Sequence, residues 1–504
     1  YNVIDLFAGP GGLGEGFLSL DKCEGRFKIR MSVEMEPNAH QTLQLRAFVR
    51  QFPDPPPEYY DYIRGTISRS ELFERHPQEA AVAVEETLRG PRELGASDDD
   101  ELIYSRLRSL KRKHGGPWVV IGGPPCQAYS LVGRARNRGI KGYQAEKDKR
   151  HFLYTEYLKV LQTMRPEVFV MENVKGILSS KVDDQRIFPK LLEDLRCPNK
   201  ALGKRSTRQG RYRIYSLVTG QELGHEDTAG SDCIIRSEEY GVPQTRHRVI
   251  LLGVREDIDA MPGVLQKAPR QVNAGAMLAD LPDIRSGLSR QRDSNEAWAA
   301  EVAAQAKVVA RELRRHGVSD HAVPWAVKRA GRLKSRGGQY VPCSKKFKGP
   351  DNLRDWLVDS NIGGFVNHES KAHMASDLGR YLYCASFARE RDGASPRSSE
   401  FAEAFVPDHK SWASGKFADR FKVQSRNAPS STIVSHIAKD GHYYIHPDPG
   451  QCRSLTVREA ARLQTFPDNY FFEGNRTQQY VQVGNAVPPF LATQIARIVR
   501  GLLS

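Results

Sequence analysis

Short apolar runs that end in glycine or in a polar residue recur along the first half of the chain. Residues 3–7 lead into a glycine-rich stretch at 8–14, residues 118–121 lead into Gly-Gly-Pro-Pro-Cys-Gln at 122–127, and residues 168–171 end in Glu-Asn-Val at 172–174. Runs of this length between turn residues are typical of strands buried on both faces of a sheet. They predict an open α/β sheet whose functional loops meet at the carboxyl ends of its strands.

Two of these strand ends carry reactive side chains. Cys126 lies on the constrained loop after one strand, and Glu172 ends another. A thiolate can add to an electron-poor carbon while an acid protonates the conjugated nitrogen that makes that carbon electrophilic. A buried cysteine is more often inert, and a strand-end Glu-Asn pair is more often a helix cap. If both groups are functional, the pairing suits attack on a pyrimidine ring.

The first glycine-rich stretch predicts a ligand loop. Glycines there let the backbone approach a bound molecule closely, although a purely structural turn is an alternative. Glu34 follows about twenty residues later, where an acid can accept both ribose hydroxyls of an adenosyl group. Because the loop lacks Gly-Lys-Ser or Gly-Lys-Thr, adenosylmethionine is a better candidate than a nucleoside triphosphate.

Composition narrows the class of protein. A chain of 504 residues favours two domains, and a net charge of +15 with a pI of about 9.4 favours a polyanionic partner. The sequence shows no apolar run long enough for a membrane span and no basic-then-apolar leader, so we expect a cytoplasmic, nucleoid-associated protein. Its seven cysteines form no CxxC pair, which argues against a disulfide framework or a zinc site. The chain opens on Tyr1 rather than Met, which leaves open whether residues precede it.

Six segments, in order, resemble the motifs of DNA cytosine-5 methyltransferases of the bacterial restriction-modification or defence type. They are Asp-Leu-Phe-Ala-Gly-Pro-Gly-Gly at 5–12, Pro-Cys-Gln-Ala-Tyr-Ser at 125–130, Glu-Asn-Val at 172–174, Gln-Thr-Arg-His-Arg at 244–248, Arg-Glu-Ala-Ala-Arg-Leu-Gln at 458–464 and Gln-Val-Gly-Asn-Ala-Val at 482–487. The resemblance implies a Rossmann-like, adenosylmethionine-dependent methyltransferase domain with a second, smaller target recognition domain.

The resemblance also implies roles for the catalytic residues. Cys126 is similar to the nucleophile that adds to cytosine C6, and Glu172 to the group that protonates or hydrogen-bonds N3. Arg248 matches the arginine on the base's O2, while Arg246 is expected to support Glu172 or the backbone. The set is completed by Asn173, Gln127 and Ser130.

The cofactor site is implied by residues at both ends of the chain. Glu34 resembles the ribose ligand, and Met35 replaces a common aromatic neighbour. Thr66 and Ile67 occupy the place expected for a Gly-Asp-Ile motif, from which they depart. The other implied contacts are Phe7, Ala8, Gly9, Gly11, Gly12, Asn485 and Ala486. We expect S-adenosyl-L-methionine, with S-adenosyl-L-homocysteine as product, and no metal, because the histidines at 368, 373, 436, 442 and 446 lack tight ligand spacing.

Four segments are expected along the chain. A catalytic domain spans 1–254, a target recognition domain 255–450, a small-domain or hinge segment 451–479, and a return to the catalytic domain 480–504. Insertions at 70–116 and 196–232 are interpreted as solvated decorations, the first as surface helices and the second as a hairpin or loop near the target.

Basic stretches predict contacts to double-stranded DNA from which the target base is flipped. We expect contacts from Arg134, Arg136 and Arg138 after the catalytic loop, from Lys345, Lys346 and Lys348, and from Thr432. Any restriction or defence subunit would be a separate chain, and the enzyme is expected to be monomeric on DNA.

Two alternatives share part of this pattern. Methylation of tRNA uses the same chemistry, but the large variable region and the lack of an obvious Cys-Phe-Thr element argue against it. A catalytically inactive DNA-binding regulator conflicts with the presence of Cys126, Glu172 and Arg248 together. The recognition sequence and the biological setting stay open.

Overall fold

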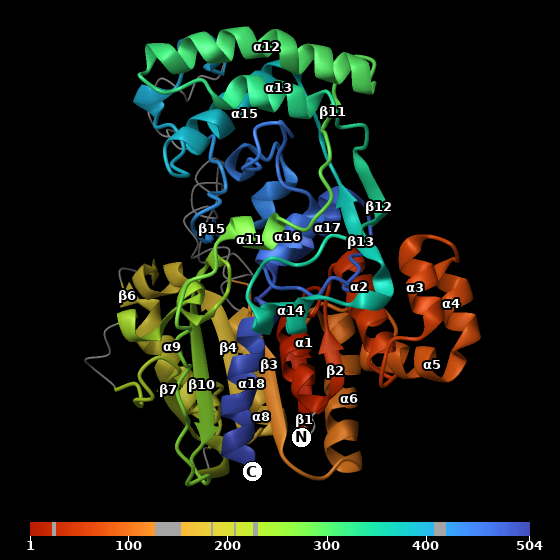
Figure 1. Ribbon diagram of the computed structural model, residues 1–504. Coiled ribbons are helices and arrows are strands. Elements are labelled where there is room, and N and C mark those ends of the chain that lie inside the picture. The colour runs from red at the N-terminus through yellow and green to blue at the C-terminus, as the bar shows by residue number, and fades with distance from the viewer. Residues whose placement is uncertain (23–26, 126–152, 183–184, 206–207, 225–229, 408–419) are drawn as a thin grey trace.

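One central sheet organises the N-terminal half of the chain in the computed structural model (Figure 1). The structure describes residues 1–22, 27–125, 153–182, 185–205, 208–224, 230–407 and 420–504. The sequence-predicted residues Cys126, Gln127, Ser130, Arg134, Arg136 and Arg138 therefore lie outside the described residues.

The sheet has the order β2-β1-β3-β4-β10-β7, with β8 also paired to β10. Its first four strands are parallel, and β10 is antiparallel to β4, β7 and β8. The strands are β1 (Asn2–Leu6), β2 (Lys28–Val33), β3 (Trp118–Gly122), β4 (Val168–Val174), β7 (Tyr212–Ser216), β8 (Ile234–Arg236) and β10 (His247–Arg255). Three of the apolar runs singled out in the sequence are thus adjacent strands, β1, β3 and β4.

Helices cover both faces of this sheet. One face packs on α6 (Ser97–Lys113), α8 (Leu153–Met164) and α9 (Ile187–Arg196), and the other on α1 (Gly12–Leu18) and α18 (Pro489–Leu503). The C-terminal α18 lies directly against the N-terminal α1, so the two ends of the chain share one core. This arrangement confirms the predicted Rossmann-like α/β fold.

Both predicted insertions contribute to the domain's core, which corrects their interpretation as solvated decorations. Residues 70–116 do form helices, but α6 buries Ile103, Leu107 and Leu110 against the sheet. Within 196–232, the strand β7 pairs with β10 and buries Tyr212. The helical spacing of the apolar residues of α6 lets one side of the helix pack on the sheet, and β7 is long enough to pair with β10 as a strand of that sheet.

A group of helices lies beside β2: α2 (Pro37–Val49), α3 (Pro57–Arg64), α4 (Arg69–Arg75) and α5 (Pro77–Glu86). The apolar core of this group also includes residues from the second half of the chain, such as Ile362 and Val366. Short elements elsewhere in this half are β5 (Lys181–Val182), β6 (Gln185–Arg186), α10 (Pro198–Ala201) and β9 (Gln244–Thr245).

In the second half, extended chain leads to a layer of helices that lies above the sheet in the view of Figure 1. Helices α12 (Asn295–Arg315), α13 (Ala322–Ala330) and α15 (Ala375–Glu390) pack around Trp298, Tyr381 and neighbouring apolar residues. The remaining elements are α11 (Ala274–Leu278), β11 (Gly287–Leu288), β12 (Gly337–Pro342), α14 (Asp351–Leu357), β13 (Gly364–Glu369), β14 (Ala372–His373), β15 (Ser430–Ser431), α16 (Val457–Leu463) and α17 (Arg476–Asn485). Among the described residues, no helix is long and apolar enough to cross a membrane.

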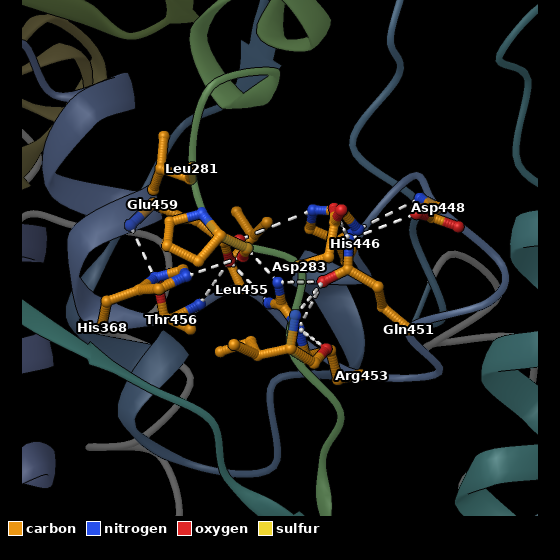
Figure 2. A network of polar contacts seen from close by, with 12 residues as sticks. Leu281, Asp283, His368, His446, Asp448, Gln451, Arg453, Leu455, Thr456 and Glu459 are labelled. Atoms are coloured by element: carbon orange, nitrogen blue, oxygen red, sulfur yellow. Dashed lines mark hydrogen bonds and ion pairs between the residues drawn. The ribbon is translucent and has the colours of Figure 1, made fainter. Parts of the chain in front are cut away.

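A buried polar network connects α16 to other segments of the second half (Figure 2). Both guanidinium Nη atoms of Arg453 donate to Glu459, each at 2.7 Å, and the Thr456 backbone N–H donates to the same carboxylate at 2.7 Å. His446 lies 3.5 Å from Glu459, and His368 bonds Thr456 and the carbonyl of Pro282. The Arg453 guanidinium holds the pKa of Glu459 far below its usual range against the effect of burial, and burial lowers the pKa of each histidine to about 4. We call these residues the Glu459 network.

Candidate active site

Two of the predicted catalytic side chains form an ion pair across neighbouring strands. Arg248 Nε on β10 lies 2.9 Å from Glu172 Oε1 on β4, and each side chain is 14% exposed. In the antiparallel register Glu172 faces Ile250, so Arg248 is its diagonal neighbour on the same face of the sheet. Burial lowers the pKa of the Arg248 guanidinium, and the Glu172 carboxylate opposes that shift.

This ion pair lies against the start of the loop that carries Cys126. β3 and β4 are parallel, with Gly122 beside Met171. A Cβ added at Gly123 would be 2.8 Å from Glu172 Oε2, so a larger residue there would have to displace the carboxylate. The described chain continues to Pro125, one residue before Cys126. The fold therefore brings the stem of the thiol loop and the carboxylate together, as the strand ends predicted.

Arg246 holds the backbone around the pair. It is almost fully buried, and its guanidinium donates to the carbonyls of Ile433, at 2.7 Å, and Gly484, at 3.2 and 3.3 Å. Burial lowers its pKa well below the usual value. Of the two roles expected for Arg246, these contacts favour support of the backbone. Asn173 accepts from the backbone N–H of Val174 at 2.8 Å and so shapes the strand end.

The glycine loop and Glu34 form a second site at the ends of β1 and β2. The backbone N–H of Gly9 donates to Glu34 Oε2 at 2.8 Å, and that of Glu36 donates to Oε1 at 2.7 Å. Burial raises the pKa of Glu34, while these two N–H groups lower it. The loop is left-handed at Gly9 and Gly11, with φ of 58° and 98°, and also at Phe7. This backbone places Phe7 and Ala8 at the turn, where the Ala8 N–H donates to the Val33 carbonyl.

The C-terminal segment closes on the same loop. A Cβ at Gly12 would collide with the Val487 carbonyl and touch the Cβ of Ala486. Asn485 is exposed at the end of α17, and Gln464 Nε2 donates to the Ala486 carbonyl at 3.0 Å. Residues separated by more than 470 positions therefore meet, as the resemblance implied.

The contacts described for Thr66 and Ile67 do not include Glu34. Both residues lie between α3 and α4, where Thr66 Oγ1 donates to the Asp61 carbonyl, and Ile67 packs in the apolar core beside β12 and β13. The segment that reaches Glu34 is 87–93, because the Arg92 N–H donates to the Glu34 carbonyl at 2.8 Å. Leu88 and Arg89 in this segment are both left-handed. Met35 lies beside it with 55% exposure, free to contact a ligand.

Asp5 is a site residue that sequence reasoning passed over. It is fully buried at the end of β1, and neither carboxyl oxygen has a hydrogen-bond partner among the described residues. A Cβ at Gly14 would lie 3.0 Å from its Oδ2, so it sits under the glycine loop's helix. Burial raises the pKa of Asp5 to about 8. The signal was available: an acid inside an apolar strand needs a partner.

The expected DNA contacts of the second half are dispersed. Lys345 is engaged, with Nζ donating to the Leu281 carbonyl and lying 3.2 Å from Asp283. Lys346 and Lys348 are exposed on the same loop. Thr432 instead lies at the catalytic half, where its hydroxyl donates to the Thr245 carbonyl at 2.6 Å. Five histidines were considered as metal ligands in the sequence. Four of them, at 368, 373, 442 and 446, are buried and hydrogen-bonded, and His436 is exposed.

The fold is that of a Rossmann-like methyltransferase, and the comparisons with known proteins specify the family. The family model for C-5 cytosine-specific DNA methylase matches residues 111–197 and 223–500. The chain is 32% identical to the type II methyltransferase M.Bpa9945I of Bacillus paralicheniformis, over all of this chain and 99% of the relative. It is 25% identical to the DNA (cytosine-5-)-methyltransferase M.ApeKI of Aeropyrum pernix, over all of this chain and 99% of that one. The chain belongs to the C-5 cytosine-specific DNA methylase family.

A solved structure agrees in fold. A candidate DNA modification methyltransferase encoded within an E. coli prophage superposes with a TM-score of 0.51 at 18% identity, covering all of this chain and 99% of the other. At that identity the likeness concerns the fold alone.

Proposed function

We propose that this chain transfers a methyl group from S-adenosylmethionine to C5 of a flipped cytosine within a specific duplex DNA sequence. The observation that carries the proposal is the Glu172–Arg248 ion pair packed against Gly123, at the stem of the Cys126 loop. A carboxyl group and a guanidinium side by side match the N3 and O2 edge of cytosine. Family membership supports the same reaction.

The proposed chemistry uses the thiol as a temporary nucleophile. Cys126 Sγ bonds to cytosine C6 while Glu172 protonates or hydrogen-bonds N3 and Arg248 holds O2. Electron density then moves to C5, which accepts the methyl group. A base removes the C5 proton, and the resulting electron pair expels Cys126 as thiolate. Both Arg246 and Arg248 interact electrostatically with Glu172, and two guanidiniums beside the Cys126 loop would favour the thiolate.

The residues around the glycine loop fit the methyl donor. Glu34, already oriented by two backbone N–H groups, has the chemistry to accept ribose hydroxyls. Gly9 has open space beside it, Gly12 packs closely on the Val487 carbonyl, and Asn485 is exposed just before Ala486. The buried, unpartnered Asp5 has the chemistry to pair with an ammonium group. When bound, adenosylmethionine supplies an electrophilic methyl group. We assign the adenine side to segment 87–93 and Met35 rather than to Thr66 and Ile67.

Sequence choice is assigned to residues 255–450, with 451–479 joining that segment to the catalytic half. Specific readout needs side chains on base edges, whereas phosphate contacts bind all sequences alike. We also propose that the enzyme acts as a monomer on double-stranded DNA in the cytoplasm, at the nucleoid, and that any restriction or defence subunit is a separate chain.

The deciding experiment tests the covalent step. Duplex DNA carrying 5-fluorocytosine at the methylated site should trap the enzyme as a denaturation-resistant adduct, because the fluorine blocks proton removal from C5. Cys126→Ala should form no adduct and transfer no methyl group, while keeping its affinity for adenosylmethionine. Turnover by Cys126→Ala would overturn the mechanism. Methyl transfer to tRNA in preference to duplex DNA would overturn the substrate.

A further inference from the structure

Two hollows in the described part of the chain differ in charge. One, of about 660 Å³, is lined by Thr245, residues 393–398 and 421–425, Ala428, Pro429 and Ser431. We call it the Arg397 groove. Among its described lining residues Arg397 and Lys422 are cationic and none is acidic. The other hollow, of about 610 Å³, includes Glu369, Glu473 and a single arginine, Arg476. Only the first hollow has a charge balance that suits a polyanion.

The cations of the Arg397 groove are available for a ligand. Arg397 is exposed and Lys422 half-buried, and among the described residues neither forms an ion pair with a carboxylate. The Lys422 ammonium lies 5.2 Å from the centre of the Tyr443 ring, which orients it without neutralising it. Lys345, in contrast, is paired with Asp283. A phosphate contact requires a cation that is not already paired with an acid.

The floor of the groove is tied to the base-binding ion pair. Strand β15 pairs with β9, and the Thr245 hydroxyl donates to the Ser430 carbonyl at 3.0 Å. Thr245 precedes Arg248 by three residues. Figure 1 shows β15 between the helical layer and the central sheet. A DNA strand bound in this groove would therefore have a defined position relative to Glu172 and Arg248.

We propose that the Arg397 groove binds the sugar-phosphate backbone of the DNA substrate, with Arg397 and Lys422 as phosphate contacts. The inference deepens the proposed function and rests on it. The hydroxyls of Ser398 and Ser431 and the absence of acidic residues from the described lining fit phosphate oxygens. Because phosphate contacts position DNA without reading its sequence, the groove sets the register between recognition segment and target base.

The test measures the salt dependence of binding to a short duplex of arbitrary sequence. Each lost phosphate contact should lower the slope of log K against log salt by about 0.9, so the loss of affinity of Arg397→Gln between about 50 and 200 mM salt should be about threefold smaller than the loss of affinity of wild type. Lys422→Gln should behave alike, and the double variant should show both changes. Arg397→Lys should restore the slope, because it keeps the charge. Lys307→Gln, an exposed lysine on the outer helix α12, is the matched control.

The outcomes separate the two proposals. Reduced slopes for Arg397→Gln and Lys422→Gln, with an unchanged methylated sequence, support the groove. Slopes equal to those of wild type and Lys307→Gln overturn it. A changed methylated sequence also overturns it, because the residues would then read bases, and so does a loss of affinity confined to tRNA. A wild-type enzyme that binds duplex DNA with a steep salt slope but transfers no methyl group refutes the proposed function and leaves the groove intact.

Discussion

Two of the arginine–carboxylate pairs in the described part of the chain have surroundings that differ sharply. Arg453 and Glu459 are at most 1% exposed and meet in two hydrogen bonds of 2.7 Å, with Thr456 adding a third to the carboxylate. Arg248 and Glu172 meet at 2.9 Å, each remains 14% exposed, and both border the thiol loop. The first pair has its hydrogen-bonding capacity occupied by protein, whereas the second remains open to a ligand.

The difference shows how burial sorts similar chemistry into structure and function. A buried carboxylate needs several donors, because an unpaired charge in the interior costs several kcal/mol. The Glu459 network supplies them from α16, the turn before it and His446 (Figure 2). The pair in the site is shielded only in part, so a bound base can complete it. Asp5 is an intermediate case, buried like Glu459 but without a partner among the described residues.

The largest effect is expected from a change in the partly exposed pair, Glu172 and Arg248. Glu172→Gln removes an acid but keeps its shape, so methyl transfer should fall by on the order of 10² to 10⁴, the usual contribution of general acid catalysis. The free energy of unfolding should fall by less than in Glu459→Gln, because each side chain of the Glu172–Arg248 pair keeps 14% of its surface exposed. Steady-state kinetics and urea unfolding measure the two quantities. Near-normal methyl transfer would remove Glu172 from the catalytic set.

The buried pair should respond in the opposite way. Glu459→Gln leaves Arg453 as an uncompensated charge in the interior, and the expected destabilisation is about 3 to 5 kcal/mol. Urea unfolding should show this loss, with Glu172→Gln as the matched acid-to-amide control. If both variants unfold alike, the contrast drawn between the two pairs is wrong.

Acid should weaken the Glu459 network. His368 and His446 have a folded pKa of about 4, below the value near 6.5 of the unfolded chain, so the unfolded state takes up protons first as pH falls. Stability is fully present above about pH 6.5 and declines toward pH 4, by about 2 kcal/mol per histidine between about pH 7.5 and pH 5. Glu459, whose pKa is depressed, adds a further loss at still lower pH. Urea unfolding across this range should show a shallower decline in His446→Gln, and an equal decline in that variant would contradict the assignment.

The smallest effect sharpens the cofactor site. Glu34→Ala should weaken adenosylmethionine binding by about 1 to 3 kcal/mol, the range for removal of a charged hydrogen-bond partner. Thr66→Ala should leave the affinity within about 0.5 kcal/mol of wild type, because the exposed Thr66 hydroxyl bonds the Asp61 carbonyl at the end of α3. Calorimetry on the three proteins decides. A larger loss from Thr66→Ala than from Glu34→Ala would restore the sequence-based assignment.

Much of the site could be predicted because its residues follow strands directly. β1, β3 and β4 read as apolar runs, and parallel strands bring their carboxyl ends to one edge, so Glu34, Glu172 and the stem of the Cys126 loop had to be near one another. Thr66 and Ile67 were assigned by motif position alone, and such a match says nothing about how the helices α3 to α5 around them are arranged.

The sequence by itself determined the class of fold and the family, because strand periodicity and ordered motifs are local properties of the chain. Only the tertiary structure decided which charges are satisfied. The pairing of Lys345 with Asp283, the lack of a partner for Asp5 among the described residues and the saturation of Glu459 depend on neighbours 3 to 62 positions away, or on the lack of them. Burial and partner geometry set the free energy of a charge, and neither is a property of its place in the sequence.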